Sequence, residues 1–338
     1  MDETIVEVDD LRVDFPVMAG TIHALQGVNF ALRRSKTTCI VGESGSGKSV
    51  TARSLMQILQ RPGRIASGSI RYRDDDGKIT DIAAQAAGGR TMRAIRGREI
   101  GMVFQEPMTS LSPVHRIGEQ IMEPLQLHFG LPKREARERV LDMMAKVGIP
   151  NPTQRFDNYP FQLSGGLRQR VVIAIALICQ PRLLIADEPT TALDVTTQAN
   201  ILDLLRQLQD EMKMSVMFIT HDLGVVAEIA DDVVVMYAGS VAESADVDTI
   251  FHAPQHPYTR ALLQSVPRLS ADKNQPLATI RGMVPHPLAR PQGCVFHPRC
   301  DRFLPGTCDA VEPPTVAVAP EHAVKCIRVG PDLEDIGL

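Results

Sequence analysis

The sequence predicts an α/β fold built around a mostly parallel β-sheet. Two fully apolar segments, residues 183–186 and 216–219, have the composition of strands buried on both faces of a sheet. A segment with helical periodicity, residues 198–212, lies between them and completes a strand–helix–strand unit. A third apolar segment, residues 38–41, ends in a glycine-rich turn that leads into a predicted helix at residues 49–59.

Other segments add to this core. The alternating residues 6–8 and 11–15, together with residues 22–32, predict strands near the N-terminus. Residues 100–104 form another apolar strand, and helical periodicity covers residues 118–148 and 167–179. The polar, glycine-rich residues 74–89 suggest a surface insertion.

Length and composition exclude several classes of protein. The 338 residues suit one large domain with an appendage, and 44% hydrophobic residues can bury a core. A net charge of −4 without a long basic run disfavours a nucleic-acid binder. The longest apolar run, residues 171–179, is far shorter than the roughly 20 residues of a membrane-spanning helix, and the acidic residues 1–11 do not resemble a secretory signal. We therefore expect a cytosolic chain that contacts membranes only through partners.

A phosphate-binding loop follows the strand at residues 38–41. The segment Gly42-Glu-Ser-Gly-Ser-Gly-Lys48-Ser49 fits G-x-x-x-x-G-K-[ST] in the required strand–loop–helix context. Its glycines allow backbone N–H groups to face phosphates at a helix N-terminus, Lys48 reaches the β- and γ-phosphates, and the Ser49 hydroxyl binds Mg²⁺. The predicted nucleotide contacts here are Gly42, Ser44, Gly45, Ser46, Gly47, Lys48, Ser49 and Val50. The motif indicates a P-loop NTPase, but on its own it also fits kinases and GTPases.

Two carboxylates follow the apolar strand at residues 183–186. Asp187 can hold Mg²⁺ through water, and Glu188 can orient and deprotonate the attacking water. An Asp-Glu pair at a strand end is usually a solvated turn, and its position after a phosphate-binding loop favours the catalytic interpretation.

The segment Leu163-Ser-Gly-Gly166-Leu-Arg-Gln169 resembles the signature motif of ABC-type ATPases. The resemblance implies that Ser164, Gly165, Gly166 and Gln169 contact the γ-phosphate bound to an opposite subunit, again through glycines, a hydroxyl and a helix N-terminus. Leu167 departs from the polar residue that is often found there. The resemblance also implies a RecA-like core with an antiparallel β subdomain and a helical signature subdomain at about residues 106–180.

The same resemblance assigns further site residues by motif position. Gln105 matches the glutamine that contacts Mg²⁺ and signals to the membrane partner, and the Ala192-Leu193-Asp194 segment matches a loop at the dimer interface. His221 matches the histidine that contacts the γ-phosphate. Phe15 is the candidate for stacking on adenine, although a strand phenylalanine more often belongs to the core.

Four segments are similar to the D-type ATPase subunit of bacterial dipeptide and oligopeptide importers. They are residues 104–113, 186–195, 256–259 and 293–300. The resemblance implies a heterodimer with a second related ATPase subunit, two transmembrane permease subunits and an extracytoplasmic solute-binding protein. It places the chain peripherally on the cytoplasmic face of the inner membrane. Related importers carry nickel chelates or glutathione, so another small solute remains an alternative to peptides.

The proline-rich tail contains four cysteines. We expect an ATP-binding domain over residues 1–250 and a separate cysteine-rich accessory domain over residues 251–338, because regular α/β structure does not tolerate this density of proline. Four of the six cysteines lie in it: Cys294, Cys300, Cys308 and Cys326. In the resembling subfamily these positions ligate a [4Fe–4S] cluster, and four thiolates suit one. Zinc with His297, or unligated thiols, remain alternatives.

Competing functions are a soluble ABC ATPase of DNA repair or translation and a non-hydrolysing regulatory subunit. The first usually shows two ATPase cassettes, coiled coils or basic surfaces, none of which occurs in this sequence. The second is disfavoured because Lys48, Gly165, Glu188 and His221 are all present. The sequence thus favours an ATP-hydrolysing import subunit that uses ATP and Mg²⁺.

Overall fold

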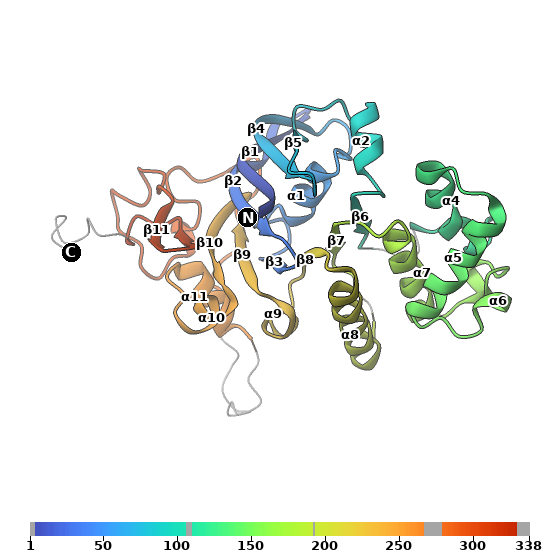
Figure 1. Ribbon diagram of the computed structural model, residues 1–338. Coiled ribbons are helices and arrows are strands. Elements are labelled where there is room, and N and C mark those ends of the chain that lie inside the picture. Colours follow the sequence, from blue (N-terminus) through green and yellow to red (C-terminus); the bar gives the residue numbers. More distant parts are fainter. Residues whose placement is uncertain (1–3, 106–109, 192, 267–278, 330–338) are drawn as a thin grey trace.

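The computed structural model describes residues 4–105, 110–191, 193–266 and 279–329, which form two β-sheets, a helical lobe and a C-terminal region (Figure 1). The expected α/β fold is confirmed. Within the described ranges, no helix is long and apolar enough to cross a membrane.

An eight-stranded sheet forms the centre of the molecule, in the order β11-β12-β10-β9-β3-β8-β7-β6. The five strands from β9 to β6 are parallel, and β10, β11 and β12 continue the sheet with antiparallel pairs. Their bounds are Thr37–Val41 for β3, Ile100–Val103 for β6, Leu183–Asp187 for β7, Ser215–Ile219 for β8, Asp232–Tyr237 for β9, Ser240–Asp246 for β10, Val316–Ala319 for β11 and His322–Val324 for β12.

The central strands are apolar because both faces of the sheet are covered. Every residue of β3, β7 and β8 is buried. Successive side chains face opposite cores: Cys39 and Val41 belong to one, and Ile40 belongs to the other. Helix α8 (Val195–Met212) connects β7 to β8, as the sequence predicted.

A four-stranded antiparallel sheet packs over one face of this core, in the order β2-β1-β4-β5. Its strands are β1 (Thr4–Val17), β2 (Gly20–Arg33), β4 (Arg64–Arg73) and β5 (Ile79–Asp81). The presumed surface insertion at residues 74–89 is wrong in part, because it contributes β5 to this sheet and buries Ile82 completely. Helix α1 (Lys48–Leu55) packs its Ala52 and Leu55 into the same core.

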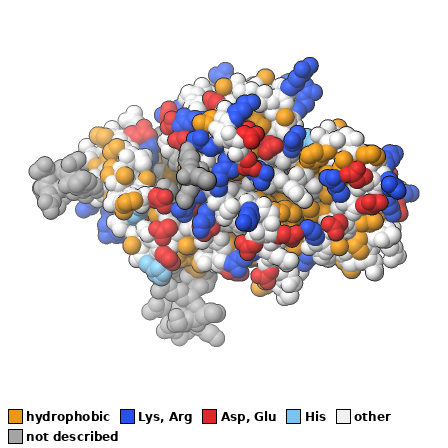
Figure 2. All heavy atoms as spheres, viewed as in Figure 1, with side chains coloured by type: hydrophobic (Ala, Val, Ile, Leu, Met, Phe, Trp, Pro, Cys, Tyr) orange, Lys and Arg blue, Asp and Glu red, His pale blue; other side chains and the backbone are white. Residues whose placement is uncertain are grey.

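A helical lobe lies to one side of the central sheet, on the right in Figure 1. It contains α4 (Ile117–Phe129), α5 (Lys133–Lys146), α6 (Pro152–Arg155) and α7 (Gly165–Leu177). Ile121, Val140 and Ile173 are fully buried among these helices. Figure 2 shows that hydrophobic side chains also gather on the exposed surface of this lobe. The remaining helices are α2 (Arg90–Ile95), α9 (Leu223–Ile229), α10 (Val247–His252) and α11 (Pro257–Gln264).

The C-terminal region is attached to the core by shared structure. Strand β12 pairs with β10, so this region extends the central sheet across the boundary expected at residue 250. Phe296 is buried between Tyr237 of β9 and Tyr258 of α11, with ring centroids 5.2 and 5.4 Å away. The division into domains stays a prediction, and the sheet and this aromatic cluster join the two parts.

A buried polar network secures the same junction. The Glu243 carboxylate has no exposed surface, lies 2.9 Å from His322 Nε2 and accepts the backbone N–H groups of Gln255 and His256. His256 is the N-cap residue of α11, and its Nδ1 accepts the N–H of Tyr258 at 3.0 Å. Burial lowers the pKa of His256 to about 4, although the Glu243 charge opposes this shift.

We therefore predict that His256 makes the fold sensitive to acid. Between its ordinary pKa near 6.5 and the folded value of about 4, the unfolded chain binds a proton that the folded chain does not. The stability is thus complete above pH 6.5 and falls as the pH drops toward 4. His256→Asn keeps a capping acceptor without this titration, so the loss of unfolding free energy between pH 7 and 5 should shrink by about 2 kcal/mol. Urea denaturation at both pH values measures the unfolding free energy. If the variant loses as much of it as the unmodified chain, His256 is not the source of the acid sensitivity.

Candidate nucleotide-hydrolysing site

The carboxyl ends of four parallel strands bring most of the predicted site residues together. The phosphate-binding loop follows β3, and Gln105, Glu188 and His221 follow β6, β7 and β8 in that order. Ligands of open α/β sheets bind at this edge. A cavity of about 260 Å³ opens there. Its lining includes Ser44, Gly45, Ser46, Gly47, Lys48, Ser49, Val50, Gln105 and Glu188.

The phosphate-binding loop requires glycine at two of its positions. Gly42 has φ +147°, and a Cβ there would lie 2.1 Å from the carbonyl oxygen of Met236. Gly47 has φ +104°, and its Cβ would lie 2.7 Å from Leu25 Cδ2. Only glycine allows the backbone to approach β9 and β2 this closely. The loop can therefore curl inward and present its N–H groups.

Lys48 and Ser46 are positioned to bind an anionic ligand. The Lys48 ammonium donates to the carbonyl oxygens of Gly42 at 2.8 Å and Glu43 at 3.1 Å. Burial lowers the pKa of Lys48, and the charges of Glu188, Asp187 and Glu43 act in the opposite direction. The buried Ser46 Oγ has no hydrogen-bond partner among the described residues. A phosphate in the loop would satisfy both groups.

Ser49 and Asp187 form the oxygen pair expected at a Mg²⁺ site. Ser49 Oγ donates to Asp187 Oδ1 at 2.9 Å. Asp187 ends β7 in the interior, and burial raises its pKa, while the Ser49 hydrogen bond and Arg53 oppose the shift. A hydroxyl and a carboxylate are the hard oxygen donors that Mg²⁺ prefers, so these residues fit the ion.

Glu188 is the centre of a small polar cluster. Its Oε2 accepts from Gln105 Nε2 at 3.0 Å and from Thr191 Oγ1 at 3.0 Å, and its Oε1 lies 3.4 Å from His221 Nδ1. Its backbone adopts φ +48°, which is unusual for a residue with a side chain. The sequence motifs identified Glu188, Gln105 and His221 but missed Thr191, whose only signal is its place three residues after Glu188.

The signature segment lies elsewhere. Ser164 caps α7, where its Oγ accepts the N–H of Leu167 at 3.4 Å. Apart from its chain neighbours and its own helix backbone, a Cβ on Gly165 would meet no described atom within 4 Å. Gln169 is buried, and none of the described residues lining the cavity comes from Ser164, Gly165, Gly166 or Gln169.

The loop between Glu188 and α8 is partly described. Asp194 caps α8 by accepting from Thr197 N at 3.0 Å, which lowers its pKa. Ala192, and residues 106–109 of the segment after Gln105, lie outside the described residues.

Phe15 is not among the described residues that line the cavity, and its contact with adenine stays a prediction. Its ring packs on Gly63, where a Cβ would come within 2.4 Å of Phe15 Cε1, and it lies partly buried against the core under the antiparallel sheet. Burial of an aromatic ring explains this position. From β2, Ile22, His23 and Ala24 line the cavity instead.

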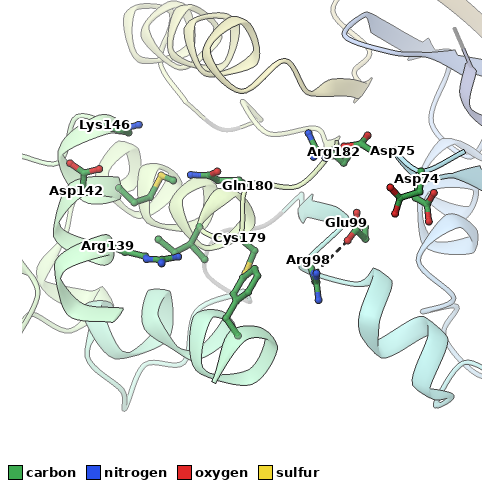
Figure 3. A pocket seen from close by; sticks show the side chains of 14 residues that line it. Asp74, Asp75, Arg98, Glu99, Arg139, Asp142, Lys146, Cys179, Gln180 and Arg182 are labelled. Atoms are coloured by element: carbon green, nitrogen blue, oxygen red, sulfur yellow. Dashed lines mark ion pairs between the residues drawn. The ribbon is translucent and has the colours of Figure 1, made fainter. Parts of the chain in front are cut away.

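A larger cavity, of about 650 Å³, lies at the opposite edge of the sheet (Figure 3). Arg139, Asp142 and Lys146 of α5 lie on one side of it, and Asp74 and Asp75 lie on the other. Arg98 pairs with Glu99 at 3.5 Å and Arg182 pairs with Asp75, just before β6 and β7 begin. These two ion pairs lie at the amino ends of the strands, away from the phosphate-binding loop.

The four tail cysteines approach one another without forming a ligand set. Cys294 N donates to the carbonyl oxygen of Cys308 at 2.7 Å. Burial raises the pKa of Cys300 to about 11, with smaller contributions from the charges of Asp301, Cys294 and Cys326. Within the described ranges, which include all four cysteines, no group of three or more His, Cys, Asp or Glu side chains is placed to hold a metal. The expected metal centre is therefore not formed in this geometry.

Comparison with known proteins identifies two family matches along the chain. The sequence profile of the ABC transporter family matches residues 25–191, and that of the oligopeptide/dipeptide transporter C-terminal region matches residues 242–308. A Brucella ovis protein assigned by name to the peptide import ATP-binding proteins is 51% identical over 332 residues, which cover 96% of this chain and 97% of that protein. A Brucella abortus protein with the same assignment is 48% identical, and the match covers 95% and 94%.

Solved structures share the fold of the core. The dimeric ATP-binding cassette MJ0796, in a post-hydrolysis state bound to ADP and Pi, superposes with a TM-score of 0.62 at 27% identity, covering 72% of this chain and 98% of that one. CbiO1 of Clostridium perfringens, part of the cbiONQ ABC transporter complex, gives 0.61 at 30% identity, covering 75% and 92%. Profiles, relatives and structures agree with the motifs.

Proposed function

The chain belongs to the ABC transporter family of ATPases, and we propose that it is the ATP-hydrolysing subunit of a peptide importer. The observation that carries the proposal is the convergence of Lys48, Asp187, Glu188 and His221 at one sheet edge. The C-terminal match to oligopeptide/dipeptide transporters and the names of the Brucella relatives support peptides as the cargo.

The proposed hydrolysis assigns one task to each side chain. Lys48 and the loop N–H groups bind the β- and γ-phosphates of ATP. Ser49, Asp187 and Gln105 would hold Mg²⁺, which neutralises phosphate charge when bound. Glu188 orients the attacking water and takes its proton, and His221 contacts the γ-phosphate. Thr191 holds the Glu188 carboxylate in place through its 3.0 Å hydrogen bond.

A second ATPase subunit completes the site in this proposal. Ser164, Gly165 and Gly166 begin α7 at an exposed surface, where N–H groups of the helix start are available to an anion. The partner that we propose is a related ATPase chain, whose bound γ-phosphate docks on this segment.

Permease subunits would dock on an apolar groove beside Gln105. This groove, of about 690 Å³, lies between β6 and α4 and includes Met102, Phe104, Pro124 and Leu127. Leu127 is 73% exposed and Phe104 is 38% exposed, so the groove offers apolar surface to a partner. Docking there would place the chain peripherally on the cytoplasmic face of the membrane, and a solute-binding protein would deliver the cargo from the other side.

The test uses the purified complex of this chain with its partner ATPase, the permeases and the binding protein in proteoliposomes. Peptide-loaded binding protein should stimulate ATP turnover and drive uptake of labelled peptide. Stimulation by nickel chelate or glutathione alone would reassign the cargo and keep the ATPase. A chain that is active without any membrane partner would instead favour a soluble ABC ATPase.

We also propose that Cys294, Cys300, Cys308 and Cys326 hold a [4Fe–4S] cluster, with zinc as the alternative. The donor chemistry supports it, since the four thiols are close enough to interact electrostatically and lie in a region with few helices or strands. The described sulfur positions do not fit ligation, so the four loops would have to draw together as the cluster forms. A metal cross-link would stabilise such a region.

Anaerobic purification tests the cluster. We expect brown protein with about four irons per chain, and Cys300→Ser should remove the colour and make the tail sensitive to protease. Cys179→Ser is the matched control, because Cys179 is a buried cysteine just after α7 in the helical lobe and does not belong to the C-terminal region. Colourless protein with one tightly bound zinc would show that the cysteines bind zinc and not an iron–sulfur cluster. Metal-free protein would show that the thiols are unligated.

A further inference from the structure

One side of the nucleotide cavity, called the wall below, is lined by residues that belong to none of the sequence motifs. Val284, Pro285, His286, Pro287 and Arg290 of the C-terminal region line it together with the phosphate-binding loop. These residues lie more than 230 positions beyond the loop that they face. The wall, defined as residues 284–290, therefore belongs to the same cavity as Lys48 and Glu188.

The C-terminal end of the wall is fixed to the core by Arg290. Its guanidinium donates to the carbonyl oxygen of Ala238 at 2.7 Å and to Ser240 Oγ at 3.1 Å, at the turn between β9 and β10. Within the wall, Leu288 N donates to His286 Nδ1 at 3.2 Å and Ala289 N donates to His286 O at 2.8 Å, which forms a turn. Three prolines at positions 285, 287 and 291 restrict the backbone further.

The segment just before the wall is connected to the phosphate-binding loop through Arg299. Arg299 Nε donates to the carbonyl oxygen of Arg281 at 2.9 Å. The same guanidinium binds the Glu43 carboxylate through two hydrogen bonds, of 2.7 and 3.0 Å, and its side chain is only 3% exposed. Because Glu43 is the second residue of the loop, this ion pair sets the distance between the wall and the loop.

The chemistry of the cavity changes from one part to another. Lys48, Ser46 and the loop N–H groups suit phosphates, whereas Val284, Pro285 and Pro287 offer apolar surface. Ile22 and Ala24 of β2 add further apolar surface, and His23 and His286 add polar ring nitrogens. An uncharged, flat group attached to a chain of phosphates matches this arrangement.

We propose that residues 284–290 contact the base and ribose of ATP, and that Arg290 positions them. The inference rests on the nucleotide site and not on the identity of the transported solute. It makes the C-terminal region part of the ATP site.

Two ligands separate contacts to the base from contacts to the phosphates. ATP and inorganic tripolyphosphate both engage the loop, but only ATP has a base and a ribose. In the full chain, Val284→Ala combined with Pro287→Ala should weaken ATP binding about tenfold and leave tripolyphosphate binding within about twofold, since each buried methylene-sized contact contributes roughly fourfold to affinity. Val311→Ala with Pro305→Ala is the matched control, because both residues are exposed and lie outside the cavity.

Unchanged ATP affinity in the folded double variant would overturn the inference. An equal loss of affinity for ATP and for tripolyphosphate would overturn it too, because the wall would then only support the loop. Failure of the unmodified chain to bind either ligand would instead challenge the nucleotide site. Photolabelling of the unmodified chain with 8-azido-ATP needs no variant. The label should appear in the tryptic peptide that begins at Gly282, and a label confined to the peptide that contains Phe15 would contradict the proposal.

Discussion

Replacing Glu188 with Gln should lower ATP turnover of the assembled complex by about 10²–10⁴ while ATP binding stays intact. The amide oxygen can still accept from Gln105 and Thr191, which now donate to Glu188 Oε2 at 3.0 Å each. The substitution thus keeps the shape of the cluster and removes the group that accepts a proton from water. Steady-state phosphate release and equilibrium binding of labelled ATP measure the two effects separately.

Glu228→Gln is the matched control for this substitution. Glu228 is an exposed glutamate of α9 that pairs with Arg206 at 3.2 Å, outside the nucleotide cavity. Its turnover should equal that of the unmodified complex. Full turnover by the Glu188 variant would remove Glu188 from the catalytic role, and loss of ATP binding would assign it a structural role.

Replacing Gly165 with Asp should reduce turnover at the partner's ATP site by about 10²-fold or more, because a carboxylate then faces the γ-phosphate that the helix start should stabilise. The open space around Gly165 means that the new side chain needs no rearrangement of the fold. ATP binding by the isolated variant chain should be normal, since this residue does not line its own cavity. Hydrolysis by mixed complexes, in which only one of the two ATPase chains is altered, measures the effect.

Gly88→Asp provides the control, since Gly88 is an exposed glycine that also has no neighbouring atom within 4 Å of a built Cβ. It should leave both sites active. If Gly165→Asp abolishes ATP binding by its own isolated chain, the signature acts within one subunit and the shared site is wrong.

The sequence predicted the parts of the site whose chemistry is local. The residues of the phosphate-binding loop, the Asp187–Glu188 pair and His221 each follow an apolar strand, and parallel strands place their carboxyl ends together. The hydrogen bond between Ser49 and Asp187 joins residues 138 positions apart, yet each was identified from its own motif. The parallel pairing of the strands then brings these two residues close together.

Contacts of the C-terminal region could not be predicted in this way. Arg299 and Glu43 are 256 positions apart, and neither belongs to a motif that specifies the other. Proline density marked the tail as irregular, but it does not reveal that β12 extends the central sheet or that residues 284–290 face the nucleotide cavity. The sequence also left open which way Phe15 faces, because a strand phenylalanine can face either side, and here it packs partly buried against the core.

The most direct test of ATP hydrolysis at this edge of the sheet is the chemical identity of the nucleotide retained by the complex. Complexes are incubated with Mg²⁺ and α-labelled ATP, separated rapidly from free nucleotide and denatured, and the label is resolved into ATP and ADP. The Glu188→Gln complex should retain intact ATP at its altered site, whereas the unmodified complex should retain mainly ADP. Equal conversion to ADP in both complexes would contradict the assignment of Glu188 as the catalytic base.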